Sequence, residues 1–236
     1  MLKRFTLLFL VLSSIAFLSG CMYPQDKLAK NQVPYESQIE EVQKAVNKFQ
    51  KDNDGILPIK TKDQSTPIYE KYPIDFKKMI PNYLSDAPGN SYENGGIFQY
   101  VLIDVENKPK VKIFDLRIAE KVREIHMRID AQGYPPFKDQ VSKNVYTINY
   151  KKIGYKEEPY AISPYTNNNL PFVITTKGEI YVDYSSDLYQ ALKNNKEHVK
   201  QGEDIRSILT KNSQFVPAYS LPYTVDEKNE PIFLTK

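Results

Sequence analysis

The side chains that most often perform catalysis are scarce in this sequence and form no known catalytic pattern. Only two histidines, His126 and His198, accompany the 29 acidic residues of the 236-residue chain. Both histidines lie in segments with helical spacing, and His126 borders an apolar stripe, which favours a half-buried core position over a general base. No nucleophile elbow, zinc-binding helix, redox cysteine pair or phosphate-binding loop occurs. A carboxylate pair for hydrolysis of a glycoside stays open, because such a pair is defined by distance in space.

The single cysteine has a chemistry of its own, because it ends the tetrapeptide Leu18, Ser19, Gly20, Cys21. The tetrapeptide resembles the lipobox of bacterial lipoproteins. In that class the cysteine thiol carries a diacylglyceryl group, the chain is cleaved before the cysteine, and the new amino group can be acylated as well. Two acyl chains hold a protein stably on a membrane, whereas one is marginal. We therefore predict a lipid attachment at Cys21.

The residues before this tetrapeptide have the layout of an export signal. Lys3 and Arg4 precede an uncharged apolar stretch at residues 5–17, which is too short for a comfortable membrane span. This layout predicts a cleaved signal peptide at residues 1–20 and a mature protein anchored to the extracytoplasmic face of the cell membrane. An ordinary exported protein with a chance cysteine is the alternative.

A run of tyrosines supplies the candidate binding surface. The chain has 18 tyrosines and no tryptophan. A tyrosine offers an apolar face and a polar tip, which suits sugars, peptides and protein partners. If residues 145–151 are extended, alternate side chains share one face. The alternative is that these tyrosines fill strands and loop cores. The candidate surface consists of Tyr146, Tyr150, Tyr155, Tyr160 and Tyr165.

Two segments with helical spacing each precede a copy of nearly the same motif. We expect the two helices to position the candidate tyrosines. Apolar residues recur three and four apart from Ile39 to Phe49 and again from Ile118 to Ile129. The pattern Asp-x-x-Gly-x-x-Pro-x-Lys follows each of them. Glycine can adopt the left-handed conformation that closes a helix, so Gly55 and Gly133 are predicted helix caps with positive φ. A calcium loop is the alternative, but the acidic residues lack the spacing of an EF-hand.

Strand–turn–strand patterns follow each helix, and a weaker helix–hairpin unit ends the chain. The predicted fold class is α+β, with duplicated helix-then-β-hairpin units packed as one compact domain behind a lipid-anchored tether. A coincidence among common helix stops and hairpins is the alternative. The expected parts are a signal peptide at 1–20, a lipidated N-terminus and tether at 21–35, a first unit at 36–115, a second unit at 116–185, and C-terminal helices and hairpin at 186–236.

Several stretches together resemble one known family. They are the lipobox, "LPIKTKDQSTPIYEKYPIDFKKMIPNYL", "GYKEEPYAISPY" and "GEIYVDYSSDLYQ". They resemble the YphF-type lipoproteins of Bacillus and its relatives, and frequent lysine, asparagine and tyrosine agree with a low-GC Gram-positive source. The resemblance implies a membrane lipoprotein. It supplies no activity, catalytic residue or ligand.

Composition and motifs leave three classes of function. A net charge of +3 without a clustered basic surface argues against nucleic acid. No cofactor and no metal site is indicated. The leading hypothesis is a non-catalytic interaction or scaffold lipoprotein that holds an envelope protein or glycan partner. The alternatives are a ligand-capturing lipoprotein, either a transporter receptor or a cell-wall glycan binder, and a hydrolase.

Overall fold

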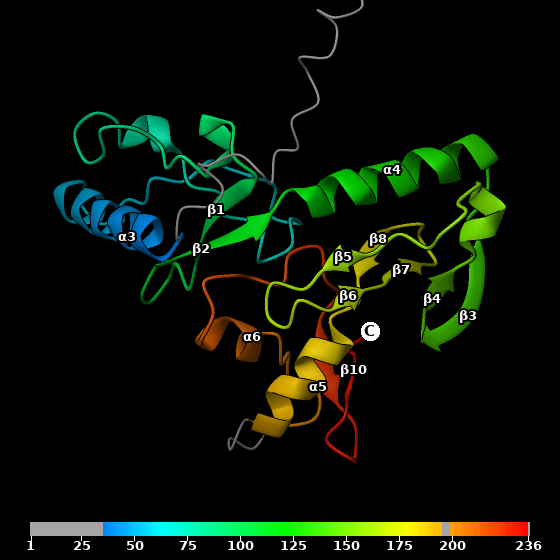
Figure 1. The fold of residues 1–236 in the computed structure, drawn as a ribbon. Coiled ribbons are helices and arrows are strands. Elements are labelled where there is room, and N and C mark those ends of the chain that lie inside the picture. The colour runs from blue at the N-terminus through cyan, green and yellow to red at the C-terminus, as the bar shows by residue number, and fades with distance from the viewer. Residues whose placement is uncertain (1–34, 195–198, 236) are drawn as a thin grey trace, which may run out of the picture.

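Two equivalent units follow one another along the chain and lie side by side in Figure 1. The computed structural model describes residues 35–194 and 199–235, so the lipobox and His198 lie outside the described residues. The first unit begins with helix α3 (Tyr35–Asp52) and ends with the antiparallel strands β1 (Phe98–Ile103) and β2 (Lys110–Asp115). Helices and antiparallel sheets occur together in one compact domain, which confirms the predicted α+β class.

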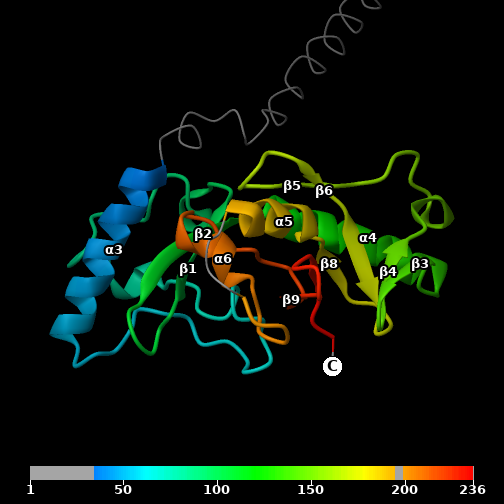
Figure 2. The same cartoon turned by 90° about the horizontal axis from the view of Figure 1, so that it is seen from below.

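The second unit begins with helix α4 (Arg117–Gln132) and contains a larger sheet. Its four antiparallel strands have the order β3-β4-β7-β8, and a short pair, β5-β6, lies in the connection before β7. A C-terminal part with two helices and a further hairpin completes the domain (Figure 2). The remaining elements are β3 (Phe137–Ser142), β4 (Val145–Ile148), β5 (Ala161–Ile162), β6 (Asn169–Leu170), β7 (Phe172–Thr175), β8 (Ile180–Val182), α5 (Ser185–Asn194), α6 (Ser207–Lys211), β9 (Tyr223–Val225) and β10 (Pro231–Phe233).

The glycines of the repeated motif follow the two helices at different distances: Gly133 comes directly after Gln132, and Gly55 comes three residues after Asp52. Gly55 has φ +85° and Gly133 has φ +88°. The Gly55 N–H donates to the carbonyl of Gln50 at 2.9 Å, and the Gly133 N–H donates to that of Ile129 at 2.9 Å. Both glycines have the predicted positive φ. Gly133 is the C-cap of α4, as predicted, whereas after α3 the first residue with positive φ is Asp54 (φ +52°), and Gly55 follows it.

The prolines of the same motif make equivalent hydrogen bonds. The carbonyl of Pro58 accepts from the Asp75 N–H at 2.8 Å, and the carbonyl of Pro136 accepts from the Asn149 N–H at 2.7 Å. These bonds pair the chain just after each joint with the chain that leads to the hairpin. The same backbone pairing at corresponding places is direct structural support for duplication.

A shortened sheet in the first unit matches the four-stranded sheet of the second. An isolated antiparallel bridge joins Ile59 to Ile74, where the second unit pairs Phe137 with Ile148. Residue 73 then pairs with β1 as β4 pairs with β7. Each unit is therefore a helix followed by the same antiparallel meander.

The second copy corrects one expectation about the tyrosines. Strand β4 ends at Ile148, and residues Tyr150–Ile153 form the 3₁₀ helix η5. The Asn149 side chain accepts a hydrogen bond from the Lys152 N–H, which turns the chain out of the strand. The proposed extension to residue 151 is therefore wrong, and Tyr150 does not continue the face of Tyr146. Its counterpart in the first unit is the 3₁₀ helix η3 (Phe76–Lys78).

The C-terminal part joins the two units. The Ile113 N–H donates to the carbonyl of Gln214 at 3.0 Å, and the Val216 N–H donates to that of Ile113 at 3.1 Å, which adds a parallel neighbour to β2. The buried ammonium of Lys112 donates to the carbonyls of Thr210 and Ser213 at 3.0 and 2.5 Å, near the end of α6. Burial lowers the pKa of this lysine, and Lys110 lowers it further.

No helix in residues 35–194 or 199–235 is long and apolar enough to cross a membrane.

The joint after α4 yields the first prediction. Gly133→Ala should lower the free energy of unfolding by about 1 kcal/mol, because a Cβ is strained at positive φ. No atom lies within 4 Å of the added Cβ, so the loss reports backbone conformation rather than a clash. Urea denaturation measures this loss. Gly133→Asn is the matched control and should lose less, since asparagine tolerates this conformation. Equal midpoints for all three proteins would contradict the cap.

Candidate functional site

The connection between η5 and β7 presents an aromatic and an aliphatic side chain to solvent. Tyr160 is 49% exposed and Ile162 is 56% exposed, whereas Ala161 is 4% and Ser163 is 0% exposed. Side chains of an extended segment point to opposite faces in turn. Pairing of β5 with β6 keeps this segment extended. Tyr160 and Ile162 therefore share the outer face, and this pair is the core of the candidate site.

The inner face of the same segment is held by a buried carboxylate. Asp187, in the first turn of α5, is 1% exposed. The hydroxyl of Ser163 lies 2.9 and 2.8 Å from its two oxygens, and the hydroxyl of Thr166 donates to it at 2.7 Å. The Ser163 oxygen also accepts from the N–H groups of Tyr165 and Thr166 at 3.0 Å. Burial raises the pKa of Asp187, although the two hydroxyls oppose that shift.

Stacking on α4 holds the other end of the connection. The guanidinium of Arg128 lies 4.1 Å from the ring centre of Tyr155, and the Tyr150 ring lies edge-on to Tyr155 at 5.7 Å between centres. Cation–π contacts of this kind stabilise an exposed site by about 0.5–1 kcal/mol. Burial raises the pKa of the Tyr155 hydroxyl to about 12, and Glu124 adds to the shift. The exposed pair thus lies between two anchored ends.

A groove separates this connection from the start of α4. Its volume is about 410 Å³, which falls in the range of pockets that accept a small molecule or a peptide side chain. Ile118 and Ala161 supply apolar lining. The charged lining comes from Asp115, Arg117, Lys121, Glu157 and Glu158.

The equivalent connection of the first unit, between η3 and β1, also reaches the first turn of α4, from the side opposite the groove. Tyr92, which is 63% exposed, lines a second hollow of about 150 Å³ together with Leu116, Arg117 and Glu120. Gly96 lines it too, and a Cβ on that residue would lie 2.0 Å from the carbonyl oxygen of Asn90. That close approach requires glycine. The corresponding loops of the two units therefore flank the first turn of α4.

Arg117 is the residue on which the two hollows meet. Its guanidinium forms a two-pronged ion pair with Asp115, with Nε 2.9 Å and Nη2 2.5 Å from Oδ2. Arginine and tyrosine are among the residue types most enriched at the energetic centres of protein interfaces. The composite face of Tyr92, Arg117, Tyr160 and Ile162 has that composition, and we call it the α4 face.

The predicted tyrosines do not form one surface. Tyr150 is 5% exposed and lies in the core, and half-buried Tyr146 packs on Phe137 with ring centres 4.8 Å apart. The Tyr165 hydroxyl is buried and its ring packs on Tyr184. Tyr165 lines a separate polar hollow between α5 and α6. Only Tyr155 and Tyr160 line the groove together.

Three contributors to the α4 face were missed from the sequence. Ile162 has a local signal, because it lies two residues after Tyr160 in an extended segment. Tyr92 and Arg117 have none, since they reach the site through the packing of the two units. Among the described residues, no three histidine, cysteine, aspartate or glutamate side chains gather to hold a metal ion.

Comparison with known proteins identifies the first unit. Residues 35–115 match the model described as the YphF family N-terminal domain. This match covers α3 through β2, and it supports the resemblance of this part of the chain to YphF-type proteins. No curated protein and no solved structure matches the chain.

Proposed function

We propose that this protein is a lipid-anchored, extracytoplasmic interaction module that holds an envelope protein at its α4 face without catalysing a reaction. The observation that carries the proposal is the outward pair Tyr160 and Ile162 on a connection fixed at both ends. Exposed apolar side chains beside a polar rim are typical of interaction sites. A fixed loop also loses less conformational entropy on binding than a mobile one.

The anchoring part of the proposal rests on the lipobox at residues 18–21. A protein held on the membrane by two acyl chains meets membrane-associated partners at a high effective concentration. A modest interaction face is then sufficient for a stable association. The groove, together with the exposed side chains of Tyr160 and Tyr92, offers a contact surface of that modest size.

A second candidate function is the capture of a small ligand between the first unit and the C-terminal part. A hollow of about 490 Å³ lies between the turn after β1 and helix α6. Tyr69, Tyr72, Ile103 and Val105 give it a largely apolar lining. Ligand sites often lie at such boundaries between structural units. This hollow becomes the leading site if the α4 face contacts nothing.

Cys21→Ser tests the anchor. Serine lacks the thiol that forms the thioether, so the variant should remain uncleaved at this position and incorporate no fatty acid. Metabolic labelling with a radioactive or clickable fatty acid, followed by isolation of the protein, measures this. Undiminished label on Cys21→Ser would refute the anchor at this residue.

Photo-crosslinking tests the α4 face. With p-benzoylphenylalanine in place of Tyr160 in the native cells, the membrane fraction should yield a discrete crosslinked protein, because this side chain faces the partner. Tyr134, which is 56% exposed just beyond the far end of α4, is the matched aromatic control position. A yield at position 160 no higher than at position 134 would refute the interaction face. Mass spectrometry of the discrete product identifies the partner.

A further inference from the structure

The charges that line the groove are not balanced. On the α4 side, Arg117 pairs with Asp115 at 2.5 Å and Lys121 pairs with Glu124 at 3.3 Å. On the opposite side, Glu157 and Glu158 are both exposed. Neither glutamate forms an ion pair within the described part of the chain. The basic wall is therefore neutralised from within, and the acidic wall is not.

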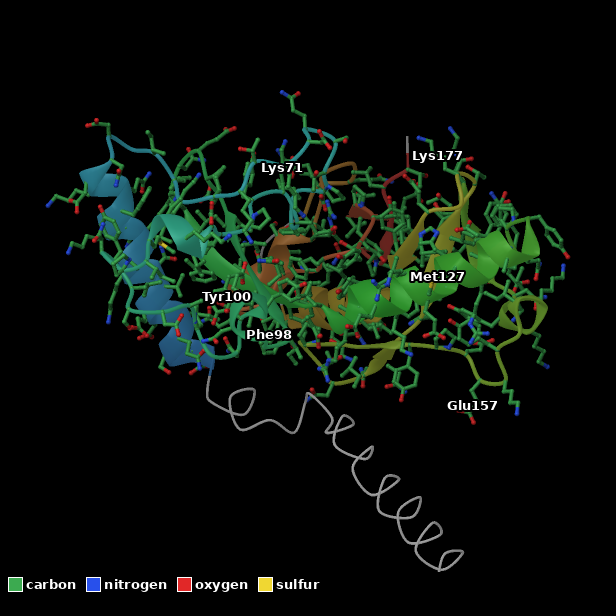
Figure 3. All side chains as sticks on the ribbon, turned by 90° about the horizontal axis from the view of Figure 1, so that it is seen from above. Lys71, Phe98, Tyr100, Met127, Glu157 and Lys177 are labelled. Carbon is green, nitrogen blue, oxygen red and sulfur yellow. The ribbon has the colours of Figure 1, made fainter. Side chains whose placement is uncertain are left out.

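The acidic pair lies next to the apolar part of the site. Glu157 and Glu158 precede Pro159 and the exposed Tyr160 directly, and all four residues line the groove. Figure 3 shows Glu157 pointing away from the body of the molecule, at the edge opposite Lys177. A segment lying in the groove would meet negative charge and an exposed aromatic ring together.

We propose that the groove between α4 and residues 157–162 binds a partner segment in which lysine or arginine side chains alternate with apolar ones. This inference rests on the proposed function and adds the chemistry of the partner. The basic groups would pair with Glu157 and Glu158, and one of them would stack on Tyr160. An ammonium or guanidinium over a tyrosine ring is attracted by the negative face of that ring. The apolar groups would cover Ile162 and Ile118.

The opposite charge pattern is disfavoured on the same grounds. An acidic segment or an anionic polymer would place like charges against Glu157 and Glu158, and juxtaposed like charges oppose association. Arg117 and Lys121 offer little compensation, because each already pairs with a carboxylate of this chain. The groove therefore selects for positive charge by repulsion as well as by attraction.

Fluorescence anisotropy with a defined peptide tests this chemistry. The probe is fluorescein-labelled Lys-Leu-Lys-Phe-Lys, titrated with the full chain in a non-ionic detergent, and Glu-Leu-Glu-Phe-Glu is its charge-reversed counterpart. The basic peptide should bind at least about tenfold more tightly than the acidic one, and added salt should weaken its binding. Equal binding of the two peptides, or binding of neither, would overturn the proposal.

Charge-reversal variants of the protein test whether the basic peptide binds in the groove. Glu157→Lys with Glu158→Lys should weaken binding of the basic peptide at least about tenfold, because it reverses the unpaired wall. The matched control is Glu227→Lys with Glu230→Lys, which makes the same change of net charge in the exposed turn between β9 and β10. That control should stay within about twofold, as screened charges far from a site act weakly. Equal losses in the two double variants would show a general charge effect and refute the groove.

The experiments distinguish a failure of the proposed partner chemistry from a failure of the proposed interaction module. A partner crosslinked through position 160 whose binding is unchanged by Glu157→Lys with Glu158→Lys would refute the charge chemistry and leave the interaction module intact. Absence of any crosslink through position 160 would refute the interaction module itself.

Discussion

The buried carboxylate of Asp187 is the interaction on which the candidate site depends. A carboxylate removed from water is costly unless its oxygens accept hydrogen bonds. Here the hydroxyls of Ser163 and Thr166 supply those bonds, and the same Ser163 oxygen accepts two backbone N–H groups. The connection before β7 is therefore tied to helix α5 by a cluster of buried hydrogen bonds. Because the inner face of this connection is held in this way, Tyr160 and Ile162 lie on its outer face and are exposed to solvent.

Duplication explains where the α4 face lies. Each unit passes from a 3₁₀ helix to its hairpin through a long connection, and that connection carries the exposed tyrosine in both. In the chain, α4 begins two residues after β2 ends. The end of the first unit and the start of the second therefore occupy the same place, and both connections reach it. A face composed in this way needs the two units to be packed together.

Contacts between distant parts of the chain hold the C-terminal part against the first unit. Lys112 in β2 donates to carbonyls beside α6, and Glu70 accepts from the Tyr219 N–H at 2.7 Å. The ring of Tyr69 lies 5.0 Å from the guanidinium of Arg206. Burial raises the pKa of the Glu70 carboxyl, against the opposing effect of the hydrogen bond from Tyr219. These contacts are long-range in sequence, so they act only in the folded domain.

Local patterns in the sequence were sufficient to predict the helices and hairpins that recur along the chain. Helical spacing predicted both α3 and α4, because the apolar stripes at 39–49 and 118–129 lie within these two helices. Turn residues predicted the hairpins β1–β2, β7–β8 and β9–β10. The positive φ of both repeated glycines and the cap at Gly133 were predicted correctly, because a helix stop is a local property of the backbone.

The candidate site could be predicted only in part from such local patterns. Tyrosine suits a core as well as a surface, and only packing separates buried Tyr150 from exposed Tyr160. Asp187 gave no signal, since its burial depends on hydroxyls more than twenty residues earlier in the chain. Strand β3 was also missed, because it is exposed and alternates no apolar residues, whereas β4 lies within the stretch 145–151 that was considered as extended.

The central claim is that this polar cluster positions Tyr160 for a partner. The most direct test is the crosslinking yield at position 160 in the Ser163→Ala, Thr166→Val background, compared with the yield in the otherwise unchanged protein. The two substitutions remove both hydroxyl donors to Asp187 and the oxygen that accepts the Tyr165 and Thr166 N–H groups, and each lost hydrogen bond contributes about 1 kcal/mol. The yield should therefore fall at least about fivefold while the amount of protein in the membrane stays within about twofold. An undiminished yield from a normally abundant variant would contradict the account.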